Sequence, residues 1–298
     1  MVRMPEVPTP QLIAIGETMV LVAPAAAEPL LDARDFRLEP GGAEANVASH
    51  FVRLGGTAAW VGRVGDEMLG RRLVRQLAER GLDVRWVDVD PNAPTGVYFK
   101  DPGRGVHYLR RGSAASRMSP ATLDGLPIDE AAVVHVSGIT AALSESCAAL
   151  VDAAIERTAR STARFSFDVN YRPALWQPAA AAARLRELAA RADVVFVGLD
   201  EAQALWGSQT PAEVREMLPE PGILVVKDGD VGATEFSADG ETHVPAHRVE
   251  VVEVVGAGDA FAAGYLTALL RGADAEGRLD AGHRSAVTVL GTTGDFPA

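Results

Sequence analysis

A single carboxylate, Asp259, follows two closely spaced glycines in the stretch VEVVGAGDAFAAGYL, residues 252–266. A β-branched run precedes the glycines and an apolar run follows them, which predicts a strand, a Gly-rich turn and a helix. The free N–H groups at a helix start, together with the helix dipole, bind anions, so Gly256, Ala257 and Gly258 predict a backbone phosphate site. In the first turn the dipole would keep Asp259 ionised, ready to accept a proton from an attacking hydroxyl group.

The same stretch allows a plainer interpretation. Asp259 could simply cap the helix, because Asp is a favoured capping residue, and spacing alone does not decide between capping and catalysis. A dinucleotide-binding fingerprint is excluded, since its sixth position is Phe261 instead of Gly. A P-loop is excluded as well, because neither lysine of the chain, Lys100 or Lys227, follows the required glycine run.

The overall composition limits the partners and the compartment. The 298 residues carry a formal net charge of −12, and an acidic surface repels phosphate backbones, so we expect no nucleic acid partner. The only cysteine is Cys147, which leaves no disulfide within the chain and no CxxC metal site. We find no secretion signal and no apolar run of the ~20 residues that a membrane span needs. We therefore expect a cytoplasmic protein without a membrane partner.

Strand and helix patterns alternate along most of the chain. Helices are predicted over residues 44–54, 66–81, 144–159, 178–191 and 200–207, with a last helix that begins near Asp280. Buried strands are predicted over residues 131–138, 164–170, 192–198, 222–229 and 252–256. Residues 93–112 interrupt this alternation and predict a hairpin around the turn DPGRG. The pattern indicates an α/β fold with a mostly parallel sheet, helices on both of its faces and a small β insertion.

Two long motifs resemble those of the ribokinase-like (PfkB-type) sugar kinases. The first is GGAEANVASHFVRLGGTAAWVGRVGDEMLG, residues 41–70, and the second is GAGDAFAAG, residues 256–264. The resemblance implies one kinase domain over residues 1–298, a three-layer α/β/α sandwich with a small β-strand lid. The lid segments would lie near residues 30–41 and 93–112. It also implies a homo-oligomer, often formed through the open edges of the lid strands.

The resemblance implies a reaction as well. ATP would transfer its γ-phosphate to a primary hydroxyl of a sugar, with Mg²⁺ neutralising the nucleotide phosphates. Asp259 would take the proton from that hydroxyl. The backbone amides of Gly256, Ala257 and Gly258 would bind the transferred phosphate and stabilise its charge in the transition state.

Other residues would serve the nucleotide. Lys227 and Gly229, in VVKDGDVGA, would lie beside ATP, although Lys227 could equally be a solvated strand end. The family motif Asn-x-x-Glu, which organises magnesium and phosphates, reads GLDE here: Glu201 matches, but Gly198 replaces the asparagine. Glu253 and Val254 replace the usual Asp-Thr before GAGD, which leaves a requirement for a monovalent cation open.

Within the family, the stretches IGETMVLVAP, PTGVYF, VHYLRRGSAASRMSP, VHVSGITAALS and FDVNYRPALW resemble members that phosphorylate 2-keto-3-deoxygluconate. The implied sugar contacts are Gly42, Asn46, Tyr98, Tyr108, Arg110, Arg172 and Asp295. The two arginines fit an acidic sugar, because a guanidinium pairs with a carboxylate as a planar fork. They could instead form structural salt bridges, and the sugar could be fructose or another keto-deoxy acid. The rival of another class is a non-catalytic sugar or nucleotide sensor that keeps the kinase fold.

Overall fold

The computed structural model describes residues 9–26, 28–249 and 255–290, and within them the largest element is an eight-stranded sheet. Its strand order is β14-β13-β12-β11-β10-β9-β1-β4, and the strands from β12 to β4 run parallel to one another. β13 and β14 continue the sheet antiparallel. The strand bounds are β1 (Leu12–Ile15), β4 (Ala58–Val61), β9 (Val133–Ser137), β10 (Arg164–Asp168), β11 (Val194–Gly198), β12 (Ile223–Asp228), β13 (Gly232–Ser237) and β14 (Gly240–Pro245).

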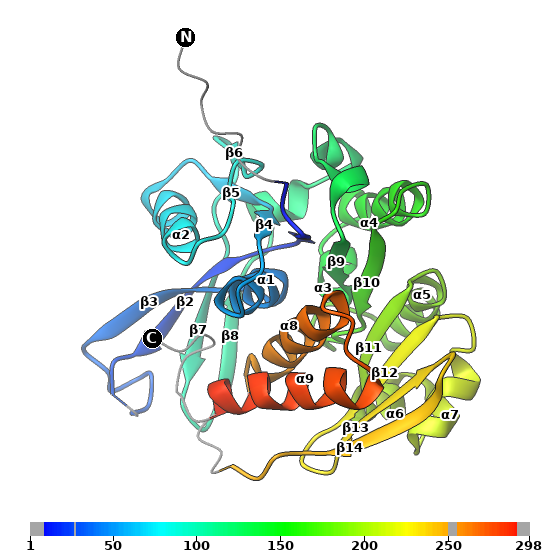
Figure 1. Cartoon of the computed structure of the whole chain (residues 1–298). Helices are drawn as coiled ribbons and strands as arrows, with labels where there is room; N and C mark the ends of the chain where they lie inside the picture. The colour runs from blue at the N-terminus through cyan, green and yellow to red at the C-terminus, as the bar shows by residue number, and fades with distance from the viewer. Residues whose placement is uncertain (1–8, 27, 250–254, 291–298) are drawn as a thin grey trace.

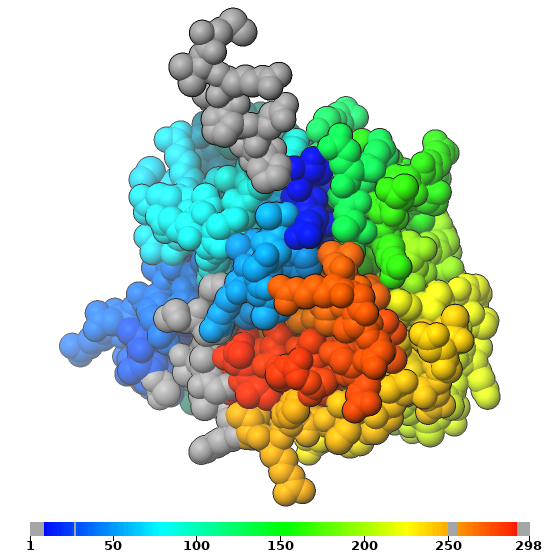
Figure 2. All heavy atoms as spheres, viewed as in Figure 1, coloured from blue at the N-terminus to red at the C-terminus, as the bar shows by residue number. Residues whose placement is uncertain are grey.

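Helices cover both faces of this sheet (Figure 1). One layer contains α1 (Ala43–Arg53), α2 (Met68–Glu79), α8 (Ala257–Leu270) and α9 (Ala275–Leu290). Figure 2 shows the atoms of α1, α8 and α9 side by side on the face toward the viewer. The other layer contains α3 (Gly138–Ala142), α4 (Glu145–Thr158), α5 (Pro178–Ala190), α6 (Leu199–Trp206) and α7 (Pro211–Met217).

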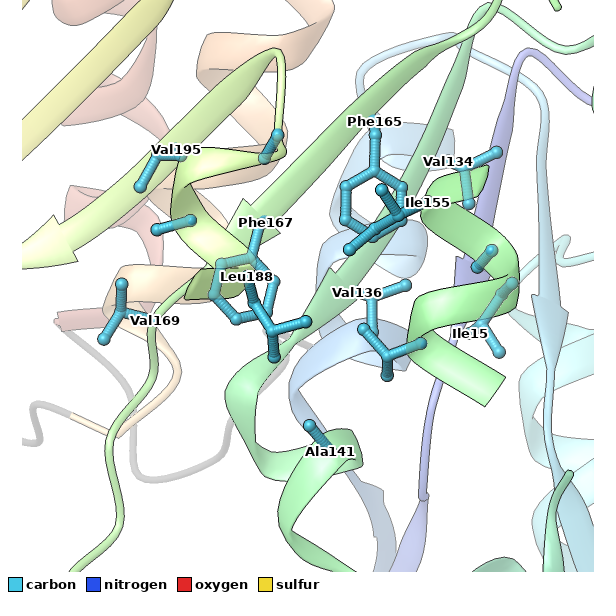
Figure 3. Packing of buried hydrophobic residues seen from close by; sticks show 14 of the residues in the cluster. Ile15, Val134, Val136, Ala141, Ile155, Phe165, Phe167, Val169, Leu188 and Val195 are labelled. Carbon is cyan, nitrogen blue, oxygen red and sulfur yellow. The ribbon is translucent and has the colours of Figure 1, made fainter. Parts of the chain in front are cut away.

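The apolar sequence of the parallel strands explains the two layers. All five residues of β11 are buried, and successive side chains point to opposite faces of a strand. Val195 therefore joins the hydrophobic cluster of the α4–α5 layer, whereas Phe196 joins the cluster under α1 and α8. Figure 3 shows the first cluster, in which Phe165 and Phe167 of β10 lie among side chains of β9, α4 and α5. The expected three-layer α/β/α fold is confirmed.

A second, four-stranded sheet lies beside the large one, and we call it the small sheet. Its order is β3-β2-β7-β8, with bounds β2 (Met19–Pro24), β3 (Phe36–Gly41), β7 (Val97–Asp101) and β8 (Gly105–Leu109). β7 and β8 form the predicted hairpin, paired antiparallel. A short parallel pair, β5 (Arg63–Gly65) and β6 (Asp88–Asp90), and the 3₁₀ helices Ala114–Arg117, Pro120–Leu123 and Ile128–Glu130 complete the described elements.

Two predicted elements need comment. The strand expected over 252–256 falls largely outside the described residues. The start predicted for the last helix near Asp280 is wrong, because α9 begins at Ala275, where the side chain of Asp274 accepts a hydrogen bond from Gly277 N at 2.9 Å. Gly277 weakens the helical pattern within the missed stretch. A Cβ at Gly282 would press on Phe261, so that glycine allows α8 and α9 to pack closely. Among the described residues no helix has the length and apolarity to cross a membrane.

His135 of β9 gives a testable prediction about stability. The ring is buried against β10, with Nδ1 3.0 Å from Ser166 Oγ, and burial lowers its pKa to about 4, with Lys227 adding repulsion and Asp168 opposing. The unfolded chain then binds this proton near pH 6.5 and the folded chain does not, so stability falls as the pH drops from 6.5 toward 4. Between pH 7.5 and pH 5 we expect this residue to cost about 2 kcal/mol in the free energy of unfolding.

Urea unfolding of the wild type and of His135→Gln at both pH values measures the effect. The variant lacks the titrating ring and should lose about 2 kcal/mol less than the wild type on acidification. Equal losses in the two proteins would contradict the assignment.

Candidate active site

A cleft of about 600 Å³ opens where the large sheet meets the small sheet, and we call it the cleft throughout. The carboxyl ends of several parallel strands supply one wall, including Asp168 at the end of β10 and Gly198 at the end of β11. This edge is where α/β sheets bind their ligands, because the loops and helix N-termini meet there. The predicted site residues that line the cleft are Gly42, Asn46, Tyr98, Tyr108, Arg110, Arg172, Glu201, Lys227, Gly229, Gly256, Gly258 and Asp259.

The start of α8 reaches the cleft through a turn that favours glycine. Gly256 is the N-cap residue and has a left-handed backbone, with φ 84° and ψ −11°. Ala257 is the first helical residue, and Asp259 lies in the first turn. Gly256, and not Asp259, therefore occupies the N-cap position, so the simple capping interpretation of Asp259 is wrong. The arrangement brings the leading amides of α8 and one carboxylate to the same wall of the cleft.

A hydrogen bond orients Asp259. Nδ2 of Asn46, on α1, donates to Oδ2 of Asp259 at 2.9 Å, so the two sequence motifs meet across 213 residues of chain. Asn46 is buried, which leaves the amide little freedom to turn away. With Oδ2 engaged in this way, the position of the whole carboxylate is fixed relative to α1.

A buried carboxylate that the sequence analysis missed supports α1 itself. Glu44 accepts hydrogen bonds from the Ser137 backbone N at 3.0 Å and from the hydroxyls of Ser137 and Thr140, both at 2.7 Å. Burial raises the pKa of Glu44, although these hydrogen bonds oppose the shift. Gly42 precedes this helix in extended backbone, and a Cβ there would overlap the backbone oxygen of Glu17. The helix start is thus fixed to the ends of β1 and β9.

Lys227, on β12, faces three carboxylates from other elements. Its Nζ lies 3.1 Å from Oδ2 and 3.4 Å from Oδ1 of Asp168, and the side chain is only 20% exposed. Burial opposes the charged form, but attraction to Asp168, Glu201 and Asp259 outweighs it, so the pKa of Lys227 is raised. The interpretation as a solvated strand end is wrong, since the ammonium is paired inside the cleft.

Glu201 is held by the backbone at the start of α6. Its Oε2 accepts from Gly198 N and its Oε1 from Tyr171 N, both at 2.9 Å. Burial and repulsion by Asp168 raise its pKa. A Cβ at Gly198 would overlap the carboxylate of Asp200, so the space beside this glycine is already taken by an acidic side chain. The described residues contain no group of three or more His, Cys, Asp or Glu placed to hold a metal ion by themselves.

Both predicted arginines reach the cleft. Arg110, at the end of β8, forms an ion pair with the buried Glu17, whose Oε1 also accepts from Ser113 Oγ at 2.5 Å. Nε of Arg110 is buried and has no hydrogen-bond partner among the described residues. Arg172 is half exposed, with Nη1 3.2 Å from the backbone oxygen of Tyr171 and 3.9 Å from Glu201. The salt-bridge interpretation thus holds for Arg110 without removing it from the cleft.

The small sheet adds two aromatic rings. Tyr98 and Tyr108 stack with their centroids 5.6 Å apart, and the guanidinium of Arg110 lies 5.7 Å from the Tyr108 ring. Tyr98 is buried, whereas Tyr108 is 45% exposed. The hairpin therefore presents a partly apolar surface next to a cation.

Some residues of the cleft were not predicted, and some predictions cannot be located. Asp168 and Asn170 line the cleft, and Asn170 has φ 39°, a left-handed conformation uncommon outside glycine. Their position at the carboxyl end of a buried strand was the available signal. Asp295, and Glu253 with Val254, lie outside the described residues.

Four similarities to known proteins extend over most of the chain. A family model described as pfkB family carbohydrate kinase matches residues 9–297. The 2-dehydro-3-deoxygluconokinase of Thermoproteus tenax is 38% identical over 297 residues, covering 96% of this chain and 90% of that protein. Fructokinase-1 of Oryza sativa subsp. japonica is 33% identical over 270 residues, covering 87% and 83%. The crystal structure of a PfkB protein from Polaromonas sp. JS666 is 32% identical, with a TM-score of 0.88 and coverage of 95% and 97%.

The left-handed turn before α8 gives a second testable prediction. A Cβ at residue 256 costs about 1–2 kcal/mol in this conformation, so Gly256→Ala should lower the free energy of unfolding by that amount. Urea unfolding measures it, with Gly222→Ala as the control, because a Cβ there meets nothing closer than 3.7 Å and φ is not positive. A loss no larger than that of the control would show that the turn tolerates a side chain.

Proposed function

The chain belongs to the PfkB family of carbohydrate kinases, and we propose that it transfers the γ-phosphate of ATP to the primary hydroxyl of 2-keto-3-deoxygluconate. One observation carries the proposal. The leading amides of α8 and the Asp259 carboxylate share a single cleft with Arg110 and Arg172. A phosphate site, a base and two cations for an acidic sugar thus lie within reach of one small substrate.

Asp259 is proposed as the general base. The carboxylate accepts the proton of the sugar hydroxyl as the oxygen attacks phosphorus, and the hydrogen bond from Asn46 fixes its direction during the transfer. The backbone amides of Gly256, Ala257 and Gly258 stabilise the charge on the phosphoryl oxygens. These amides belong to a packed helix, so they need no rearrangement when that charge develops.

Lys227, Gly229 and Glu201 are proposed for the nucleotide side of the cleft. Magnesium that travels with a nucleotide needs only one or two protein carboxylates, since phosphates and waters supply its other ligands. Glu201 and the neighbouring Asp200 fit that requirement, because both line the cleft and neither lies in a closed metal cage. When bound, the ion would neutralise the phosphate charge.

The sugar pocket is proposed to consist of Gly42, Asn46 and the side chains of the hairpin with Arg172. An acidic sugar is favoured over fructose because two guanidiniums face a cleft that otherwise contains several carboxylates. The buried Nε of Arg110, which has no acceptor in the described part of the chain, supports this assignment, since a buried donor without an acceptor is costly. Fructose remains the alternative substrate, in view of the similarity to fructokinases.

Replacement of the base tests the catalytic assignment. Asp259→Asn keeps the shape of the side chain and cannot accept the proton, so kcat should fall by about 10²–10⁴-fold while the Kd of ATP and of the sugar changes little. An assay that couples ADP release to a sugar panel measures kcat, and calorimetry measures Kd. If the wild type binds sugar but releases no ADP with any member of the panel, the protein is a sensor and the kinase assignment fails.

Replacement of Arg172 tests the substrate. Removal of a charged hydrogen bond to the carboxylate costs about 1.5–3 kcal/mol, so Arg172→Ala should raise the KM for 2-keto-3-deoxygluconate by about 10–100-fold. The KM for fructose, which has no carboxylate, should stay within about twofold. Arg186→Ala is the matched control, because Arg186 pairs with Glu220 away from the cleft. Equal losses for both sugars would reject a carboxylate contact.

A further inference from the structure

The pair formed by Asp168 and Lys227 has a specific place in the cleft. Asp168 is the last residue of β10 and its side chain is 4% exposed, while Lys227 lies near the end of β12, two strands away. Both oxygens of Asp168 lie within 3.4 Å of Nζ. The carboxylate thus holds the end of a long, flexible side chain at one point.

That point is next to the first turn of α8. A Cβ built at Gly258 would lie 3.6 Å from Nζ of Lys227 and would meet no other atom within 4 Å. The ammonium therefore borders the open space in front of the helix amides. An anion bound to those amides would also lie beside Lys227, so two sources of positive potential converge on one position.

Several carboxylates surround this position. Asp168, Glu201 and Asp259 all line the same cleft, and each would repel a phosphate group. Lys227 attracts all three and is the only lysine that lines the cleft in the described residues. A lysine is a mobile point charge, so its effect on a phosphoryl group depends on where it is held.

We propose that Asp168 is a positioning residue that fixes the Lys227 ammonium beside the first turn of α8, where Lys227 acts as a catalytic residue by contacting the transferred phosphoryl group. The inference rests on the proposed kinase reaction and adds to it the group that balances the charge during transfer. Asp168 acts only through Lys227 and has no separate contact with the nucleotide or with magnesium.

A double-mutant cycle tests this dependence. Lys227→Met removes the charge and should lower the single-turnover rate of phosphoryl transfer by about 10²–10³-fold. Asp168→Asn keeps the positive charge of Lys227 but removes the carboxylate that holds it in place. This variant should lower the rate by about 10–100-fold. In the Lys227→Met background, Asp168→Asn should change the rate by less than about twofold, because the residue it positions is already gone.

Binding measurements separate this role from a structural one. Titration of each variant with ATP and Mg²⁺, without sugar, should show weakened nucleotide binding for both single variants. A separate titration with the sugar should show an unchanged Kd. Asp239→Asn, in the exposed turn between β13 and β14, makes the same charge change far from the cleft and should match the wild type. Loss of sugar affinity alone would place the pair elsewhere in the mechanism and overturn the proposal.

The remaining outcomes are also decisive. Additive rate losses in the cycle would mean that Asp168 has its own contact, for example as a metal ligand, and would overturn the inference.

Removing one partner of a buried ion pair is destabilising, so thermal unfolding is recorded for every variant. If Asp168→Asn does not fold, Asp168→Glu is used instead. This variant keeps the carboxylate charge, moves it by one methylene and should still lower the rate; a rate equal to that of the wild type would reject positioning.

A wild type without turnover but with normal ATP binding would reject the kinase reaction. An active wild type with normal Asp168 variants would reject only this inference.

Discussion

The hydrogen bond from Asn46 to Asp259 is the contact on which the site depends. It joins two helices, α1 and α8, that lie in the same layer and pack against each other. Each helix is fixed independently, α1 by the buried Glu44 and α8 by its seat on the sheet and on α9. The carboxylate therefore takes its direction from the packing of the whole layer, and no flexible loop has to place it.

Charge balance is the second constraint. The chain has a net charge of −12, and its cleft gathers Asp168, Glu201 and Asp259, yet the proposed substrates are anions. The opposing charges that line the cleft in the described residues are few: Lys227, Arg110 and Arg172. Each is paired with, or lies near, a carboxylate that holds it, so the positive potential is local and directed.

Much of this could be predicted from the sequence. The alternating strand and helix patterns gave the α/β fold, because a parallel strand buried on both faces must be continuously apolar. The two long motifs placed Asn46 and Asp259 in one site, and the hairpin placed Tyr98 and Arg110 beside it. These signals lie in short, continuous stretches of the chain, so they can be recognised from the sequence without knowledge of the fold.

The contacts between distant segments could not be predicted. Nothing in the spacing of Glu44, Ser137 and Thr140 shows that they meet, since they come together only when α1 packs on the ends of the strands. Asp168 and Lys227 stand on strands separated by β11, and their pairing needs the sheet order. The early start of α9 was missed because Gly277 weakens the helical pattern just after Ala275, where the helix begins.

The ion pair between Glu17 and Arg110 has a consequence for the hairpin of β7 and β8. Glu17 lies between β1 and β2, at the junction of the two sheets, while Arg110 follows the last strand of the hairpin. Separating them would leave a buried charge without its ion-pair partner, which is strongly unfavourable. The ion pair therefore anchors the base of the hairpin, while its other end is held by Leu30, whose backbone N donates to Asp101 Oδ1 at 2.8 Å. β7 is also paired with β2, so the hairpin cannot leave the small sheet without breaking that pairing, and Tyr98 and Arg110 keep fixed positions in the wall of the cleft.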